Sequence, residues 1–435
     1  MAQSSKPGLI KAMGMVASVA LIVGNMVGTG IYTLPASLAI TAGPISLISW
    51  GIVAVGFFFL ALIYADLGQA YPRSGGPAVY ARKAFGDFIG FEIAYSYWLS
   101  VIIGNAAIVI ATVGYISVFN ETMAASPTIQ VIVALLITWV LVGVNIVGVR
   151  QGASVSIIAT AAKLIPLFIL AIVGIWYFEP ENLTPFAPQG NGAILPAAAL
   201  IVWAFAGLES ATVPAEEVDD PRTIRRSTMI GFGLTALVYI LISVTVMGLL
   251  PNETIGGSAG PLALAASQVL GPWGATLMAI GAIVAGIGTL NGWILLSGRI
   301  PLSVAADGLF PKVLAQIHPR FHTPHISLII SALIASAMIL LRLSNSLLET
   351  FEFIVLLSVL MTLVPHMTSG LAEYVMSRRE PNMFPHRSPA TASAISIFGL
   401  AFVLWVIYGT GWESIGWGSI LLVAGVLIYW GMKRG

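Results

Sequence analysis

The sequence predicts an all-α polytopic membrane protein with twelve transmembrane helices, and three observations support this fold class. The chain of 435 residues is 58% hydrophobic and only 9% charged, whereas soluble domains carry roughly 25% charged residues. Its mean hydropathy is +0.95. Runs of about 20 apolar residues, each long enough to cross a bilayer, recur along the chain. A chain this apolar must present its helices to lipid.

The apolar runs place the predicted spans in chain order. The ninth run is short for a span. The longest polar stretches, 177–193, 251–262 and 376–390, are too short to build a core of their own, so residues 1–435 are expected to form one domain. The twelve predicted spans are 12–38, 45–68, 88–116, 127–148, 155–176, 194–217, 228–250, 271–297, 327–342, 348–375, 391–409 and 415–431.

The first span is interrupted at its middle by Gly24-Asn25-Met26-Val27-Gly28-Thr29-Gly30. A glycine inside a helix costs roughly 1 kcal/mol relative to alanine, and unpaired backbone groups in hydrocarbon cost several more. Such a break is tolerated where the unwound backbone lines a water-accessible cavity and binds a ligand. The alternative is close helix packing of the Gly-xxx-Gly kind, which the spacing of Gly24 and Gly28 also fits.

A second break, Ala206-Gly207-Leu208-Glu209-Ser210, interrupts the sixth span and carries a carboxylate. Two interrupted helices in separate portions of a membrane protein are typical of transporters built from inverted repeats. The repeat is architectural here, because spans one to five and six to ten each begin with a broken helix. We therefore expect a first repeat at about 12–176, a second at about 194–375, and two further helices at about 391–431.

Several classes of site are excluded or disfavoured by composition. The chain has no cysteine, which excludes disulfides and thiolate metal sites. Four of the five histidines lie in or near predicted loops, which argues against zinc. We expect neither a metal nor a cofactor, and the net charge of +1 gives no indication of nucleic acid binding. The first span is too long and too broken by glycine for a cleavable signal peptide, so we expect it to be retained.

Basic residues orient the predicted bundle. If the N-terminus is cytoplasmic, 17 of the 19 basic residues fall in cytoplasmic segments, while Arg342 is outside and Lys163 is within a span. This asymmetry follows the positive-inside rule and predicts cytoplasmic N- and C-termini. The 17 residues are Lys6, Lys11, Arg73, Arg82, Lys83, Arg150, Arg222, Arg225, Arg226, Arg299, Lys312, Arg320, Arg378, Arg379, Arg387, Lys433 and Arg434.

Four motifs, in order along the whole chain, carry a family resemblance. They are Gly24–Ile31 followed by Leu34-Pro35-Ala36, Pro72–Pro77 followed by Tyr80-Ala81-Arg82, Trp203–Ala211, and Ala306–Pro311. In these motifs the chain resembles the amino acid–polyamine–organocation transporters. Trp203, Glu209, the Gly104-Asn105 pair and Trp293 look closest to the basic amino acid/polyamine antiporters of the arginine/agmatine exchanger type. The resemblance implies a five-plus-five inverted repeat with broken helices 1 and 6, and alternating access around a midplane site.

The first break is suited to a substrate carboxylate. The amides around Thr29 and Gly30 begin the second half of helix 1 and present N–H groups at the positive end of a helix dipole. Carbonyls from Trp203 to Ala206, at the end of the first half of helix 6, suit a substrate ammonium. Thr29 could instead bond only within its own helix. The expected substrate contacts at the two breaks are Asn25, Met26, Gly28, Thr29, Gly30, Trp203 and Ala206.

Aromatic residues are expected to bind or cover the substrate. An indole face attracts a guanidinium or ammonium with roughly 0.5–2 kcal/mol. Trp203 precedes the second break and Trp293 lies in a helix flanked by glycines, so neither fits the interfacial position of most tryptophans. Tyr97 resembles a third gating aromatic, although packing is an equally good interpretation of this residue.

Glu209 and Lys163 are charged residues inside predicted spans. A carboxylate such as Glu209 costs about 2.5–3.5 kcal/mol to insert and usually marks an ion or proton path; its alternative role is to tie the two halves of helix 6. Lys163 departs from the apolar residue that the resemblance to the arginine/agmatine exchanger leads us to expect. From the resemblance, its ammonium replaces the sodium ion that related transporters hold between helices 1 and 8, or it carries a proton. Sodium-independent exchangers of neutral amino acids share this feature, so it leaves the substrate class open. The alternative is that Lys163 snorkels to the cytoplasmic surface.

Four further polar residues are candidates for the same cavity. His366, where the resemblance leads us to expect tyrosine, is either a proton partner or a packed imidazole. Asn105, Ser358 and Thr362 can line the cavity, or join helices at about 0.6 kcal/mol each. The predicted coupling or gating residues are Glu209, Lys163, Thr362 and His366, and Tyr97, Asn105, Trp293 and Ser358 complete the substrate-binding set.

The predicted function is secondary active transport, with a sodium-independent exchanger of amino acids or their decarboxylated amines as the leading hypothesis. A proton-coupled or exchange-only transporter of small neutral amino acids is the alternative. An enzyme would need a clustered nucleophile and base, and a channel would need repeated filter motifs; neither is visible. We expect a protein of the inner membrane whose partners are lipid, an amino acid or polyamine and, by resemblance, a second copy of itself.

Overall fold

The computed structural model describes residues 13–73, 75–148, 153–213, 215, 218–385 and 387–434, with side chains after the fourth span described from Thr160 onward. Within this part of the chain twelve helical segments are long and apolar enough to cross a membrane. The predicted number of spans is confirmed. Of the basic residues used to orient the bundle, Lys6, Lys11 and Arg150 lie outside the described residues.

Two of the spans are interrupted, as the glycine patterns predict. The first consists of α1 (Met15–Met26) and α2 (Gly30–Thr41), and the sixth of η4 (Asn191–Ala193), α9 (Ile194–Ala204) and η5 (Leu208–Ala211). The other spans are η1 (Gly43–Ile45) with α3 (Ser46–Ala70), α5 (Asp87–Ser117), α7 (Pro127–Val147), α8 (Ala153–Gly174) with η2 (Ile175–Tyr177), α10 (Pro221–Leu249), α13 (Pro272–Ala306), α14 (His325–Leu340) with η8 (Leu341–Leu343), α15 (Leu347–Arg379), α16 (Pro389–Gly409) and α17 (Gly411–Arg434).

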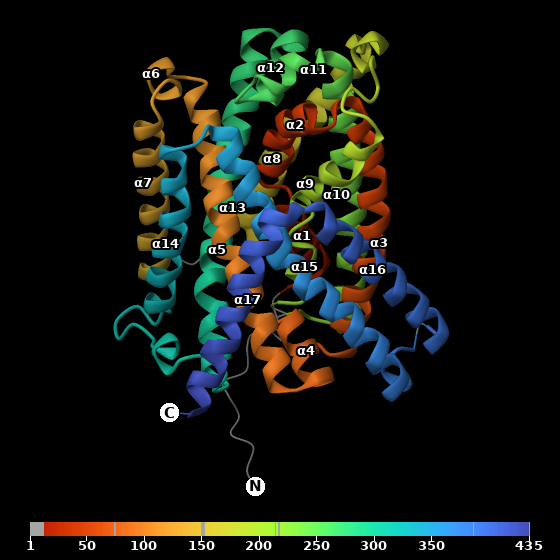
Figure 1. Cartoon of the computed structure of the whole chain (residues 1–435), viewed down its shortest axis with the longest axis vertical. Coiled ribbons are helices and arrows are strands. Elements are labelled where there is room, and N and C mark those ends of the chain that lie inside the picture. Colours follow the sequence, from red (N-terminus) through yellow and green to blue (C-terminus); the bar gives the residue numbers. More distant parts are fainter. Residues whose placement is uncertain are drawn as a thin grey trace.

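Short helices lie between the spans at the two ends of the molecule. The helix α4 (Pro77–Phe85) lies at the end where α17 terminates, whereas α6 (Glu121–Ala124), α11 (Asn252–Gly256) and α12 (Pro261–Leu270) lie at the opposite end (Figure 1). We call these the α4 end and the α12 end. The remaining short helices are η3 (Pro180–Leu183), η7 (Lys312–Ala315) and η9 (Pro381–Met383).

Helix boundaries differ from the apolar runs because hydropathy marks the lipid-facing part of a helix, whereas caps mark its ends. The helix α10 begins at Pro221, before the predicted start at 228, because the Asp220 side chain accepts a hydrogen bond of 2.8 Å from the amide of Arg222. A capping box starts α15, with Ser346 and Glu349 bonded reciprocally. The predicted sixth span, 194–217, extends beyond η5, which ends at Ala211.

The helix α5 lies at the centre of the bundle, where it packs against both α13 and α15 (Figure 1). In the most apolar stretch of 18 residues of α5, 94% of the residues are buried, whereas in that of α17 only 17% are. The side chains of α17 are therefore left for lipid or for another protein chain. The burial of α5 makes it the wall against which the two interrupted helices can enclose a site.

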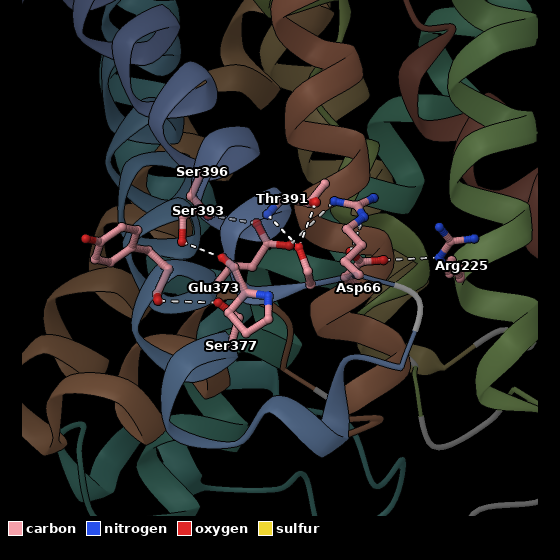
Figure 2. A network of polar contacts seen from close by, with 11 residues as sticks. Asp66, Arg225, Glu373, Ser377, Thr391, Ser393 and Ser396 are labelled. Atoms are coloured by element: carbon pink, nitrogen blue, oxygen red, sulfur yellow. Dashed lines mark hydrogen bonds and ion pairs between the residues drawn. The ribbon is translucent and has the colours of Figure 1, made fainter.

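Ion pairs and a hydrogen bond link α3, α10, α15 and α16 at the α4 end (Figure 2). Asp66 of α3 binds Arg225 of α10 at 3.1 Å and Arg387, which precedes α16, at 3.0 Å. Glu373 of α15 accepts a hydrogen bond of 2.9 Å from Ser396 of α16. Such pairs are weak evidence for added stability, because the cost of desolvating the charges offsets much of their attraction.

A second polar group at the α4 end is exposed. Lys83 of α4 and Tyr71, just beyond α3, both donate to the carboxylate of Glu380, at 3.1 and 2.8 Å. The hydrogen bond from Tyr71, followed by that from Lys83, lowers the pKa of Glu380. These contacts gather predicted cytoplasmic residues at one end of the molecule, while the side of the membrane that this end faces stays a prediction.

Candidate functional site at the two helix breaks

The first break is the non-helical segment 27–29 between α1 and α2. The amides of Tyr32 and Thr33 donate to the carbonyl of Thr29, which is therefore the N-cap of α2. The first amides of a helix have no acceptor within it and carry the positive end of its dipole. The hydroxyl of Thr29 is buried and has no partner within the described part of the chain. Helix-terminal amides and a free hydroxyl therefore meet at one point.

The glycines of this break also serve helix packing. A Cβ at Gly24 would lie 2.7 Å from Oγ1 of Thr160 in α8, and one at Gly28 would lie 2.9 Å from Thr289 in α13. Both distances are too short for any other residue. The two interpretations of the Gly-xxx-Gly spacing therefore hold together, since the same glycines permit the break and admit the neighbouring helices.

The second break follows α9 at Phe205, Ala206 and Gly207. Gly207 has φ +102°, a conformation that side chains disfavour, and it turns the chain into η5. A Cβ at this glycine would also lie 3.1 Å from the Cβ of Asn25. The two breaks are thus in direct contact, and the side-chain amide of Asn25 donates to Ser210 across them at 2.8 Å.

A cavity lies where the two breaks meet. It contains twelve of the fifteen residues that the sequence predicts for the site. These are Asn25, Met26, Gly28, Thr29, Gly30, Tyr97, Trp203, Ala206, Glu209, Trp293, Ser358 and Thr362. The cavity is further lined by Ser100, Val101, Gly104, Ile108, Ala204 and Thr289.

Glu209 provides the one carboxylate among these lining residues, and none of them carries a cationic side chain. Its Oε1 atom accepts a hydrogen bond of 2.8 Å from the hydroxyl of Tyr97 in α5. The second oxygen, Oε2, is buried and has no partner among the described residues. A buried carboxylate oxygen without a donor is costly, so a donor or cation entering the cavity would find an acceptor there.

Lys163 lies beside the first break and not in the cavity lining. Its Nζ donates to the carbonyl of Gly24 at 2.7 Å and to Oγ1 of Thr289 at 2.8 Å, so it joins α8 to α1 and α13. The side chain is 3% exposed, which contradicts the snorkelling alternative. An ammonium at this place also meets the negative end of the α1 dipole.

The sequence of the chain matches a family model described as "Amino acid permease" over residues 13–430. The chain belongs to this family. The match spans nearly the whole chain, and it confirms the resemblance to amino acid–polyamine–organocation transporters that the motifs indicate.

Three relatives show where within the family this permease lies. It is 29% identical to an arginine/agmatine antiporter of Chlamydia felis, over 96% of this chain and 89% of that protein. It is 31% identical to the putrescine transporter PotE of Escherichia coli strain K12, over 96% and 95% of the two chains. A cadaverine/lysine antiporter of the same strain is 34% identical over 82% of each chain.

Two tryptophans from different helices line the cavity of this permease: Trp203 belongs to α9 and Trp293 to α13. The ring centroids of Trp203 and Phe351 lie 5.3 Å apart, edge to face. A Cβ at Gly30 would lie 3.3 Å from the Trp203 ring, which is a tight contact. Both indoles are largely buried. Their position fits a substrate-contacting role, which stays a prediction.

Two other predicted residues of the permease lie away from the cavity lining. Nδ1 of His366 lies 2.7 Å from the hydroxyl of Tyr64, and the ring packs edge-on against Phe57. These contacts favour the packed imidazole over the proton partner. Asn105 is buried with its Oδ1 atom unpartnered in the described structure, next to Gly104, which does line the cavity.

The cavity residues that the sequence argument missed fall into two groups. Ser100, Val101 and Ile108 share one face of α5 with Tyr97, because residues three and four apart are neighbours on a helix. The position of Tyr97 was therefore a usable signal for them. Ala204 lies within the Trp203–Ala206 carbonyls that the sequence analysis assigns to a substrate ammonium, although it is not among the named contacts. Thr289 carries no such signal, since its place depends on how α13 packs against the first break.

Proposed function

We propose that the protein is a secondary active transporter that exchanges cationic amino acids or their decarboxylated amines, independently of sodium, by alternating access. The carrying observation is the Glu209 carboxylate, whose Oε2 atom is free in a cavity without cationic side chains. A negative cavity of this kind favours a cation. The two tryptophans add faces that attract ammonium or guanidinium groups.

The cavity has two poles, one with helix-terminal amides and one with a helix-terminal carbonyl, and the second supports a substrate with an amine at one end. The amides at the start of α2, with the Thr29 hydroxyl, suit a carboxylate. The carbonyl that ends α9 suits an amine, and Ala204 lines the cavity. An amino acid satisfies both poles, whereas its decarboxylated amine satisfies only the second. This difference fits exchange between the two, as the names of the relatives from Chlamydia felis and Escherichia coli describe for those proteins.

Small neutral amino acids are the second candidate substrate class. One observation favours them: Oε1 of Glu209 is already occupied by Tyr97, and most other lining residues are apolar or small. If Glu209 is protonated when substrate binds, the cavity becomes neutral and the preference for a cation is lost. Measuring substrate preference decides between the two classes.

The placement in the cell belongs to the same proposal. The α4 end carries the basic residues, so it faces the cytoplasm of the inner membrane under the positive-inside rule. The exposed apolar side chains of α17 face lipid or a second copy of the chain. The cavity serves transport and carries out no chemical conversion.

The test is counterflow in proteoliposomes that contain the purified protein. Vesicles loaded with unlabelled arginine should accumulate labelled arginine, and external agmatine, putrescine, lysine or cadaverine should compete. Alanine and serine at the same concentration should not. Uptake that needs no internal substrate would contradict exchange, and competition by alanine and serine alone would favour the second candidate class.

A further inference from the structure

Three buried hydroxyls lie along α2 between the cavity and the α12 end. Thr29 lines the cavity, and Thr33 and Ser37 follow at intervals of four residues, which place them on one face of the helix. All three residues are at most 3% exposed, and their hydroxyls have no hydrogen-bond partner within the described part of the chain. The helix continues to the α12 end, where Asn252 of α11 donates to the carbonyl of Ala39 at 2.8 Å.

Other buried hydroxyls of the bundle show how a helix normally satisfies such a group. Thr112, Ser117 and Thr362 donate to the carbonyl four residues earlier in their own helix, at 2.7, 2.9 and 2.9 Å. The three hydroxyls of α2 lack this bond. A buried polar group without a partner costs free energy, so this face of α2 favours a polar partner that enters from outside the fold.

A carboxylate lies near the far end of this hydroxyl face. Glu352 belongs to α15, and the hydroxyl of Ser37 lies close enough to act on its carboxylate. The side chain of Glu352 is partly exposed, yet its Oε1 atom is buried and has no partner among the described residues. None of the ion pairs in this part of the chain includes Glu352, and the charged group that acts on it is a second carboxylate, that of Glu349. No cation therefore neutralises it.

Glu352 lies beyond the cavity on its α12 side. Ser358 lines the cavity six residues later on α15, which corresponds to about 9 Å along the helix axis. Ser37 lies seven residues beyond Gly30, another lining residue, which corresponds to about 10 Å on α2. The two helices thus bring Ser37 and Glu352 to a similar distance from the cavity.

We infer that Glu352 and the hydroxyl face of α2 form an entry site for cationic substrate, through which an ammonium or guanidinium passes between the α12 end and the cavity that contains Glu209. The carboxylate supplies the charge, and the hydroxyls of Thr29, Thr33 and Ser37 supply hydrogen-bond acceptors along the way. A carboxylate within a membrane span usually marks such a path. This inference rests on the proposed function, since a neutral substrate has no need of a second carboxylate.

A static link between α2 and α15 is the competing explanation. In that case the hydroxyl of Ser37 and the carboxylate of Glu352 matter equally, and the charge of Glu352 does not matter. Glu352→Gln keeps the size and polarity of the side chain and removes its charge, whereas Ser37→Ala removes the hydroxyl and leaves the charge in place. The two variants therefore separate the charge from the link.

The experiment measures exchange in proteoliposomes in which all the protein has one orientation. For agmatine applied at the α12 side, the half-saturation concentration should rise roughly two- to fivefold in Glu352→Gln, as expected for a pair of charges partly exposed to water. For agmatine applied at the α4 side it should stay near the wild-type value. The inhibition constant of citrulline, which has no net charge, should be the same in both proteins. Ser37→Ala should keep the wild-type preference for agmatine over citrulline.

Glu349→Gln is the matched control. Glu349 lies three residues before Glu352 on the same helix, and it is exposed. Glutamine can replace glutamate in a capping box, so the start of α15 is preserved. Because water and salt screen an exposed charge, this variant should change the half-saturation concentration for agmatine by less than about twofold. Unfolding temperatures of all the variants are measured in parallel and should equal that of the wild type.

Two kinds of result would overturn the inference, and they can be distinguished. If the wild type exchanges arginine and agmatine but Glu352→Gln behaves like it at the α12 side, or changes citrulline as much as agmatine, Glu352 is not an entry site for cations. Equal effects of Ser37→Ala and Glu352→Gln would also contradict it and would indicate the static link. If the wild type exchanges neither compound, the proposed function is wrong, and the entry site is wrong with it.

Discussion

The two helix breaks differ in how charge is placed around them. The first break contributes neutral peptide groups and the hydroxyl of Thr29 to the cavity, and the cation that holds it, Lys163, lies behind it. The second break contributes an anion, Glu209, and it is held by the hydroxyl of Tyr97. Charge therefore lies outside the cavity at the first break and inside it at the second. When Glu209 is ionised, the cavity between them is negative, which suits a cationic substrate.

The largest effect should come from the charge inside the cavity. Glu209→Ala should abolish exchange, because it removes the carboxylate and the partner of Tyr97 together. Glu209→Gln keeps the shape and should retain weak exchange. The control is Glu413→Ala, which removes an exposed carboxylate at the start of α17. Exchange is measured by counterflow. Full activity of Glu209→Ala would mean that the carboxylate of the second break is not needed for transport.

Exchange should depend on pH through Glu209, and Glu209→Gln tests this dependence. Protonation removes the negative charge of Glu209, so the half-saturation concentration for a cationic substrate should rise as the pH falls. Glu209→Gln resembles the protonated form at every pH and should give a flatter profile. If the profile of Glu209→Gln equals that of the wild type, the titrating group lies elsewhere, and His366 is the next residue to substitute.

The charge behind the first break should affect turnover more than folding. Lys163→Ala leaves the carbonyl of Gly24 without its donor at an interface that moves during alternating access. A hydrogen bond from a charged group contributes about 1.5–3 kcal/mol, so the maximal rate should fall roughly tenfold or more. Thr160→Ala is the control, since Thr160 joins the same two helices at Ala20. Equal losses of rate and unfolding temperature in Lys163→Ala would indicate a static role.

A smaller effect is expected from Trp293, an aromatic residue of the cavity lining. Trp293→Leu should weaken binding of a cationic substrate by about 0.5–2 kcal/mol, and Trp293→Phe should keep part of this. Trp98→Phe is the control, because Trp98 is also buried but donates to the carbonyl of Ser297 outside the cavity. Binding is measured by competition, and identical affinities in all variants would mean that Trp293 only packs.

No effect at all is expected from sodium. Nζ of Lys163 donates to the carbonyl of Gly24 in α1 and to Oγ1 of Thr289 in α13, so its ammonium joins these helices. This position fits the prediction that Lys163 replaces a coupling sodium ion. Exchange should therefore be the same in sodium and in potassium solutions. A steep rise of uptake with sodium, with potassium as the control, would contradict this interpretation of Lys163.

The sequence predicts the fold well because glycine patterns and hydropathy are local. They locate the twelve spans and both breaks, and residues within a break, such as Thr29 and Glu209, come with them. What they cannot predict are partners from distant helices. Two examples depend on how whole helices pack. One is the contact of Tyr239 with Met26 and Ala204, and the other is the position of His366 beside Tyr64, outside the cavity lining.

The central claim is that the free oxygen of Glu209 selects a positively charged substrate. The most direct measurement compares competition by arginine and by citrulline, its neutral counterpart of nearly equal shape, in the wild type and in Glu209→Gln. The account predicts that the wild type strongly prefers arginine and that Glu209→Gln loses most of this preference. Equal competition by arginine and citrulline in the wild type would contradict it.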